Sequence, residues 1–423
     1  MLRLAIASLW NRRLSAALTV LCIAVSVALL LGVEKLRRDG KSAFANTISG
    51  TDLVVGARGG EVQLLLYAVF RIGDATANLR WSTFERWRAD PRVAWAVPLS
   101  LGDSHRGYRV LGTDEEYFRR YRFGRRQALV FSAGRPFAAP LEAVLGADVA
   151  RALGYRVGSS IHLAHGVGEV NTIEHAEHAF EVVGVLAPTG TPVDATVHVS
   201  LQAIERIHEG WQDGRPPSVL DRLRIGGAPA GPRGEVAELP SSITAFLIGT
   251  ERKSQLFALQ RAINTDSSEA LQAVIPGVAL QRLWDVFAVA ETLLRLVSWL
   301  VVGTAVASLL IVIISAMQAR RREMAVLRAV GATPWHLSGL LLSEAVALTG
   351  AGIVLGVGFL TVATLGLRPI VAARYGIELP IAMPTGSDLG LLAIVLAAAL
   401  LAGAIPAWMA VRQSLADGLS VRL

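Results

Sequence analysis

Histidine is the residue type whose spacing in this sequence suggests chemistry. Residues 162–180 read HLAHGVGEVNTIEHAEHAF, and this segment contains two H-x-x-H pairs, formed by His162 with His165 and by His175 with His178. Imidazole is a good ligand for Zn, Cu and Ni, and histidine-rich tracts often bind metal. If the segment folds as a hairpin, the two pairs could meet, which predicts a Zn or Cu site. The alternative is a solvated hairpin tip whose histidines only titrate near pH ~6.5.

Other motifs give no support for catalysis. Gly40-Lys41-Ser42 resembles the end of a Walker A loop, but Lys35 occupies the position of the first glycine, and an apolar segment replaces the required strand. We find no Ser-His-Asp, paired-carboxylate or H-E-x-x-H pattern in a suitable context. The only cysteine, Cys22, lies inside an apolar segment, so neither a disulfide framework nor thiol chemistry is expected. We therefore predict that the chain is not an enzyme.

The composition indicates a membrane protein. Of 423 residues, 52% are hydrophobic and only 18% are charged. Four uncharged apolar segments cover residues 14–33, 296–317, 345–367 and 389–411. At about 1.5 Å per helical residue, each is long enough to cross the ~30 Å hydrocarbon core of a bilayer. A buried core helix is shorter than these segments.

The first apolar segment has a second interpretation, a cleavable signal peptide. A small-residue cleavage motif exists at Ala43-Phe44-Ala45, but it lies about ten residues beyond the apolar run and behind a charged stretch. The apolar core of a signal peptide is also shorter, at about 7–15 residues. We therefore predict an uncleaved membrane span.

The order of the segments predicts an α-helical membrane protein with four transmembrane helices and a large α/β extracytoplasmic domain between helices 1 and 2. Arginines concentrate between the second and third spans, which places this loop and both termini in the cytoplasm. Four basic residues that follow the first span, Lys35, Arg37, Arg38 and Lys41, favour the opposite orientation. We give them less weight because long domains are translocated largely regardless of charge. The predicted parts are a cytoplasmic amphipathic helix (1–13), TM1 (14–33), the outer domain (34–295), TM2 (296–317), a cytoplasmic segment (318–344), TM3 (345–367), a short outer loop (368–388), TM4 (389–411) and a cytoplasmic tail (412–423).

The outer domain reads as a mixture of strands and helices. Residues 80–89 and 254–263 are predicted as helices, and residues 93–98, 108–111, 180–186 and 243–248 as strands. The Gly- and Pro-rich segment 226–240 predicts a break between two lobes. Residues 280–293 form a predicted helix that continues into TM2, as a rigid lever would. The basic residues are spread along this domain and the membrane flanks without any nucleic-acid-binding motif, so we expect no nucleic-acid partner.

Small residues recur at helical spacing in the third and fourth spans. Gly352 and Gly356 form a GxxxG pair, and Gly403 lies between Ala399 and Ala407 at the same period. This spacing permits close helix packing, either within the chain or in a dimer. The spans themselves contain almost no ionisable residues, which argues against an ion or proton pathway.

The segment between the second and third spans combines helix signals with charge. Residues 318–330 read as a helix that carries charged residues, and Gly331 follows it as a natural helix end. Thr333-Pro334 then provide an N-cap and a proline at the first helical position. On spacing alone, this segment is equally a positively charged cytoplasmic anchor or a binding site for a cytoplasmic motor protein.

Residues 320–358, RRREMAVLRAVGATPWHLSGLLLSEAVALTGAGIVLGVG, resemble the signature of FtsX-like ABC permeases, which include the MacB-type and lipoprotein-releasing permeases. The N-terminal sequence RLAIASLWNRRLSAALTVLCIAVSVALL is similar to their amphipathic helix and first span. Gly134-Arg135, Leu145-Gly146, Leu153-Gly154, Val157-Gly158 and FEVVGVL resemble their periplasmic core domain. The order of one span, a large domain and three spans also agrees.

The resemblance implies a permease subunit in the bacterial inner membrane, with its large domain in the periplasm. ATP and Mg would be bound by a separate dimeric cytoplasmic ABC ATPase, and the chain would pair with a second copy of itself or a paralogous permease. A periplasmic adaptor or lipoprotein would be a further partner. The resemblance assigns the ATPase contact to Arg320, Arg321, Arg322, Glu323, Arg328 and Gly331.

The implied function is conversion of ATP-driven motion into a periplasmic change that exports or extracts an envelope substrate. One alternative is a signalling scaffold that controls a periplasmic enzyme. Another, which follows from the histidines, is a permease of a transition-metal handling system. The absence of a fused nucleotide-binding domain and the large outer domain favour transport or extraction over a role in cell division.

Overall fold

The computed structural model describes residues 13–165, 173–207, 240–319, 326, 330–375 and 384–412. The chain divides into two compact units. The membrane unit consists of Met1–Gly40, Phe287–Ile370 and Leu379–Leu423. The outer unit consists of Lys41–Val286 and Val371–Glu378.

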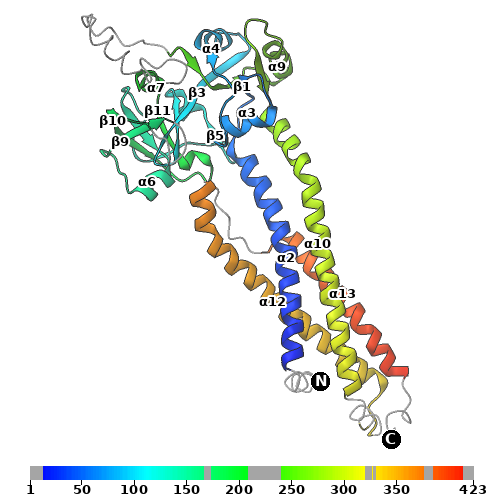
Figure 1. Cartoon of the computed structure of the whole chain (residues 1–423). Coiled ribbons are helices and arrows are strands. Elements are labelled where there is room, and N and C mark those ends of the chain that lie inside the picture. Colours follow the sequence, from blue (N-terminus) through cyan, green and yellow to red (C-terminus); the bar gives the residue numbers. More distant parts are fainter. Residues whose placement is uncertain are drawn as a thin grey trace, which may run out of the picture. The chain divides into compact units, whose positions relative to one another are not determined.

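Four long helices are apolar enough to cross a membrane. They are α2 (Arg13–Thr47), α10 (Pro276–Ala319), α12 (Pro334–Tyr375) and α13 (Gly386–Arg412) (Figure 1). The predicted fold class is therefore confirmed. The helices extend beyond the apolar segments because the residues that flank each segment, such as Glu34–Asp39, are also compatible with a helix and continue it.

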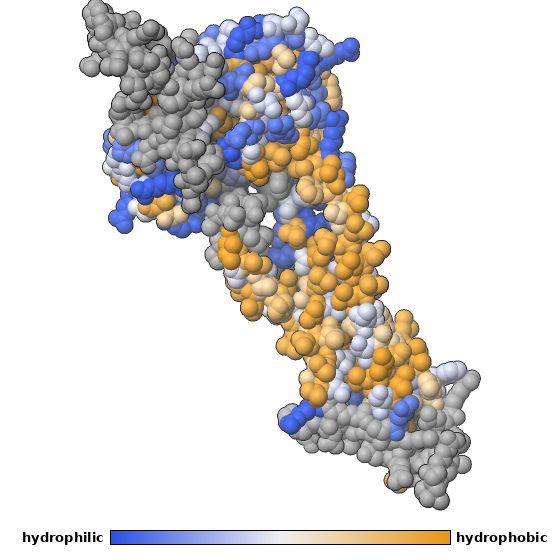
Figure 2. Space-filling view, viewed as in Figure 1, coloured by the Kyte–Doolittle hydropathy of each residue, from blue (hydrophilic) through white to orange (hydrophobic). Residues whose placement is uncertain are grey.

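The core of the membrane unit lies between these helices. Ile23 and Val27 of α2 are buried in one cluster with Val302 of α10 and Val395 of α13. Within this cluster region, the Ser26 hydroxyl donates to the Cys22 carbonyl at 2.7 Å and lies 3.2 Å from the Val301 carbonyl of α10. The outward faces remain apolar, and Figure 2 shows hydrophobic residues gathered over the long helices. Such a surface suits contact with lipid chains.

The outer unit is built on a ten-stranded sheet. The strands are β1 (Leu53–Ala57), β3 (Val93–His105), β4 (Tyr108–Thr113), β7 (Phe131–Gly134), β8 (Glu142–Leu145), β9 (Ser160–His165), β10 (Ile173–Leu186), β11 (Thr196–Ser200), β13 (Ala245–Thr250) and β14 (Leu271–Val274). Their order is β14-β1-β13-β3-β4-β11-β8-β10-β7, and β9 pairs with both β10 and β3. Most neighbours are antiparallel, whereas β4–β11 and β8–β10 are parallel. Two short pairs lie outside this sheet, β2 (Leu79–Arg80) with β12 (Ser242–Ile243) and β5 (Arg122–Phe123) with β6 (Gln127–Ala128).

Short helices pack against the sheet and contribute to three clusters of buried hydrophobic residues. They are α3 (Glu61–Ala68), α4 (Trp81–Arg88), α5 (Glu116–Arg120), α6 (Ala147–Leu153), α7 (Leu201–Ile207) and α9 (Leu256–Asn264), with 3₁₀ turns η1 (Pro192–Ala195) and η2 (Lys253–Gln255). In one cluster, Phe84 of α4 meets the edge of Phe246 of β13 with ring centroids 5.4 Å apart. The strands and helices predicted for this domain are confirmed, because each predicted range overlaps an element of the same type.

The sheet takes strands from both sides of the Gly- and Pro-rich segment at 226–240. Most of that segment lies outside the described residues. Strand β13, which follows it in the sequence, lies between β1 and β3, which precede it. The sheet is therefore continuous across the point at which we predicted a break between lobes.

The loop between β7 and β8 shows why the Gly134-Arg135 dipeptide is needed. Gly134 has a φ of +74°, and the Arg135 amide donates to the Val183 carbonyl of β10 at 3.0 Å. The Arg135 guanidinium holds both carboxylate oxygens of Glu142, at 2.6 and 2.9 Å. These bonds, together with the amides of Ala138 and Ala139, lower the pKa of Glu142 to about 2. Glu142 is thus ionised at neutral pH and closes the loop.

Candidate functional site

The predicted ATPase-contact segment lies between α10 and α12. Arg320, Arg321, Arg322, Glu323 and Arg328 lie outside the described residues. Gly331 is described and has a φ of +105°, a conformation that glycine adopts without a steric penalty.

Helix α12 begins at the position that the sequence predicts. The backbone N–H of His336 donates to the Thr333 carbonyl at 3.0 Å, and the Thr333 hydroxyl lies 2.6 Å from His336 Nδ1. Pro334 is the first residue of the helix, where its missing N–H is not required.

Apolar side chains are exposed at this end of the membrane unit. Val326, Val330 and Trp335 have relative exposures of 56%, 83% and 83%. Large apolar residues exposed next to a charged segment are typical of a protein-contact or membrane-interface surface.

The packing glycines of α12 lie against α2. A Cβ atom on Gly352 would stand 2.5 Å from Ile23 Cγ2, and one on Gly356 would stand 2.7 Å from the Ala24 carbonyl oxygen. Both distances are far below van der Waals contact, so the glycines allow the two helix backbones to approach closely. The GxxxG pair, for which the sequence left an intrachain and a dimer role open, therefore has an intrachain partner.

Gly403 of α13 has a similar role at a different interface. A Cβ atom there would stand 3.1 Å from the Ala345 Cβ of α12 and 3.9 Å from Ile313 Cδ1 of α10. Three membrane helices therefore meet near this residue.

The two ends of the histidine segment form paired strands, as a hairpin requires. His162 and His165 lie on β9, His175 and His178 lie on β10, and the two strands are antiparallel neighbours. The register pairs His165 with Ile173 and His162 with Ala179. Among the side chains that the structure describes, no group of three or more His, Cys, Asp or Glu could hold a metal ion, and those of His165, His175 and His178 are not among them. The metal site stays a prediction.

Burial shifts the pKa of two further side chains in the outer unit, His198 and Asp114. His198 of β11 is fully buried, and burial lowers its pKa to about 3, so the ring is neutral. Its ring lies 5.4 Å from that of Tyr117 and 5.8 Å from that of Phe118. Desolvation raises the pKa of Asp114 to about 6, although Arg88 opposes the shift. His198 lies in a hydrophobic core and is therefore a structural residue.

A network of charges joins α2 and α10 just beyond their apolar segments 14–33 and 296–317, and the sequence indicated only half of this network. Glu291 and Arg295 are one helical turn apart on α10, as their spacing predicts, and their side chains are 3.3 Å apart. Arg37 of α2 lies 2.5 Å from Glu34 and 3.1 Å from Glu291, and Arg295 lies 3.6 Å from Glu34. We call these four residues the outer charge network. The contacts between helices join residues about 260 positions apart, so local spacing could not reveal them.

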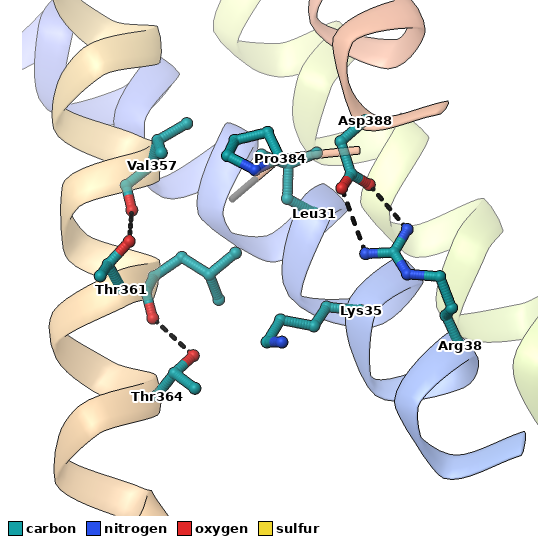
Figure 3. A pocket seen from close by; sticks show the side chains of 9 residues that line it. Leu31, Lys35, Arg38, Val357, Thr361, Thr364, Pro384 and Asp388 are labelled. Atoms are coloured by element: carbon teal, nitrogen blue, oxygen red, sulfur yellow. Dashed lines mark hydrogen bonds and ion pairs between the residues drawn. The ribbon is translucent and has the colours of Figure 1, made fainter. Parts of the chain in front are cut away.

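A second ion pair joins α2 to the start of α13. The Arg38 guanidinium contacts both carboxylate oxygens of Asp388, each at 3.1 Å, and Asp388 is only 7% exposed (Figure 3). Asp388 also accepts from the Thr385 amide at 2.8 Å, which completes an N-cap for α13. Lys35, Thr361 and Thr364 line a cavity of about 50 Å³ beside this pair, between α2 and α12 (Figure 3). The bidentate pair ties α2 to the start of α13.

Two family models match the chain. The MacB-like periplasmic core domain matches residues 16–227, which is half of the chain, and the C-terminal FtsX-like permease model matches residues 295–415. The chain therefore belongs to the FtsX-like and MacB-like family of ABC transporter permeases, as its sequence resemblance predicted. Members are typically non-enzymatic membrane subunits that work with a cytoplasmic ABC ATPase. Four spans and a MacB-like periplasmic domain fit an inner-membrane protein.

Solved structures also resemble the chain. The periplasmic region of MacB from Actinobacillus actinomycetemcomitans is 11% identical with a TM-score of 0.34, and the match covers 56% of this chain and 94% of that one. The extracellular domain of the ABC-type transporter YknZ from Gram-positive bacteria is 13% identical with a TM-score of 0.30, over 53% and 99%. No curated protein matches the chain. The family assignment rests on the family models.

Proposed function

We propose that this chain converts ATP-driven motion of a separate ATPase dimer into movement of its periplasmic domain, and so exports or extracts an envelope substrate. The observation that carries the proposal is the length of α10. It is one helix of 44 residues, Pro276–Ala319, that begins two residues after strand β14 of the outer sheet and includes a whole membrane span. An uninterrupted helix transmits displacement along its axis better than a jointed one.

Further features support coupling of the cytoplasmic ATPase to the outer domain. Helix α2 is also continuous over 35 residues, Arg13–Thr47, and the two helices are joined by the outer charge network. By the positive-inside rule, the arginine-rich segment after α10 favours a cytoplasmic position for the termini and the ATPase contact. The exposed Val330 and Trp335 add apolar area to that contact. The working unit is two copies of this chain, or one copy with a paralogous permease, on two ATPase subunits.

Charge reversal at Glu323 tests the proposed coupling. We expect Glu323→Lys to leave the membrane unit folded and to abolish the nucleotide-dependent movement of the outer domain, because the ATPase contact would meet a reversed charge. The measurement uses the full chain with Cys22→Ala and a spin label at Phe257→Cys, which is 70% exposed. Label-to-label distances between two copies are compared with and without ATP and vanadate, in the complex with the co-purified ATPase.

The control is Glu115→Lys, the same charge reversal at an exposed residue of the outer unit that directly precedes α5. This variant should behave like the parent protein. If Glu323→Lys shows the same nucleotide-dependent distance change as the parent, the assignment of Glu323 to the coupling contact is wrong. If the parent itself shows no change with nucleotide, the proposed mechanism is wrong. A co-purified sensor kinase or cell-wall hydrolase would favour the signalling scaffold instead.

Metal handling is the second candidate, favoured by the antiparallel pairing of β9 and β10, which carry the two H-x-x-H pairs on neighbouring strands. We expect the full chain in detergent to bind Zn²⁺ or Cu²⁺ with micromolar or tighter affinity in calorimetric titration. Replacement of His162, His165, His175 and His178 by alanine should abolish this binding. Equal binding by the parent and the variant would show that these histidines are not the ligands.

A further inference from the structure

A recess opens between α2, α10 and α13, at one end of their apolar segments. Its volume is about 320 Å³, at the lower end of the range for small-molecule sites. Helix α2 contributes Leu30, Val33, Glu34 and Arg37; helix α10 contributes Arg295, Ser298 and Trp299; and helix α13 contributes Ser387 and Leu391. All nine residues belong to the membrane unit.

The residues that line the recess change from apolar to charged along the helices. Leu30, Val33, Trp299 and Leu391 lie within or at the edge of the apolar spans and form apolar walls. On α2, Glu34 and Arg37 lie one and two helical turns after Leu30 and form the charged end of the recess. Trp299 is 36% exposed, and tryptophan is enriched where membrane helices meet the headgroup region. A molecule that fits this recess has an apolar chain at one end and charges at the other.

The charged end contains both signs. Arg37, Arg295 and Glu34 line the recess. Glu291 does not line it but pairs with both arginines and completes the outer charge network, within pair distances of 2.5 to 3.6 Å. The Nε of Arg37 lies 3.1 Å from Glu291 but is not aligned with it as a hydrogen-bond donor. A phosphate would be bound by the two arginines, and an ammonium group by Glu34. An anionic headgroup without an ammonium would be attracted by the arginines and repelled by the glutamates.

We infer that this recess binds one zwitterionic phospholipid of the outer leaflet, with an acyl chain against Trp299 and Leu391 and its phosphate and ammonium groups on the outer charge network. Because the network joins α2 to α10, the lipid would contact both long helices at once. The inference goes beyond the proposed function and does not depend on which cargo or ATPase is used.

Photo-crosslinking tests the site directly. The full chain carries p-benzoylphenylalanine in place of Leu391 and is reconstituted in nanodiscs of equal phosphatidylethanolamine and phosphatidylglycerol. We expect the lipid adducts, identified by mass spectrometry, to favour phosphatidylethanolamine roughly tenfold, as one hydrogen bond to a charged group would give. The matched control places the same probe at Leu389, which is 58% exposed on α13 and does not line the recess. Its adducts should follow the bulk lipid ratio.

Variants then separate the headgroup contacts from the general charge of the surface. Glu34→Gln should return the Leu391 adducts to the bulk ratio, because it removes the carboxylate that binds the ammonium group. Arg368→Gln, which removes a cation from the outer end of α12 away from the recess, should leave the preference unchanged. Val33→Trp fills the recess without altering the charges and should remove the adduct in a protein with an unchanged melting temperature. A bulk ratio at Leu391 in the parent, a preference for phosphatidylglycerol, or a crosslink to a second copy of the chain would overturn the inference.

Discussion

Replacement of Gly134 by alanine is expected to destabilise the outer unit by about 3–4 kcal/mol. The added Cβ would lie 2.0 Å from the Val183 carbonyl oxygen and 2.9 Å from Gly184 Cα, and both contacts are with backbone that cannot rotate away. The φ of +74° adds strain for any residue with a Cβ. Relief of the clash would pull β7 away from β10 and break the hydrogen bond from the Arg135 amide to Val183.

Gly154→Ala is the matched control for this prediction. Gly154 has nearly the same backbone conformation, with a φ of +70°, but no heavy atom lies within 4 Å of the position of its Cβ. It should therefore cost only the conformational strain, about 1–2 kcal/mol. Pulse proteolysis of the full chain in a urea series measures both variants. Equal destabilisation by the two variants would contradict the clash as the cause.

Conversion of both Gly352 and Gly356 to alanine is expected to destabilise the membrane unit by about 2–3 kcal/mol, because the added methyl groups would overpack the interface with α2. The nearest contacts would be 2.5 Å to Ile23 and 2.7 Å to the Ala24 carbonyl, so the helices must separate. Separation would also loosen the buried contacts of Val27. The measurement is the temperature at which the chain in detergent ceases to be monodisperse.

Gly350 and Gly358 on the same helix provide a control with the opposite expected sign. No heavy atom lies within 4 Å of a Cβ at either position, so nothing resists the added methyl groups. Alanine is a better helix former than glycine by about 1 kcal/mol per residue, and the double alanine variant should be as stable as the parent or more so. If this control loses as much stability as the Gly352 and Gly356 variant, close packing on α2 is not the reason for the glycines.

The sequence determined the elements whose stability is local. Uncharged runs of 20 or more residues must leave water, so the four spans could be predicted from hydrophobicity alone. Thr333-Pro334 specified the start of α12, because capping depends only on residues within one turn. The short strands and helices of the outer domain were predicted in the same way. The family resemblance, carried by residues 320–358 and the domain order, needed no coordinates.

Only the tertiary structure decided which elements meet. Small residues at helical spacing showed that α12 has a close-packing face, but not that α2 occupies it, since that face fits any partner helix. The Gly- and Pro-rich segment at 226–240 suggested a boundary, yet β13, which follows it in the sequence, lies between β1 and β3, which precede it. Strand pairing depends on a shared hydrophobic layer, which no local signal encodes.

The charged residues at the outer ends of the helices show the same division most clearly. Spacing on one helix paired Glu291 with Arg295, because residues four apart lie on the same face. It could not pair Arg38 with Asp388, which is 350 residues away, or Arg37 with Glu291. The positions of these partners depend on how the helices pack, and packing is set by the summed contacts of many apolar side chains. For that reason, the composition of the recess was visible only once the helices were assembled.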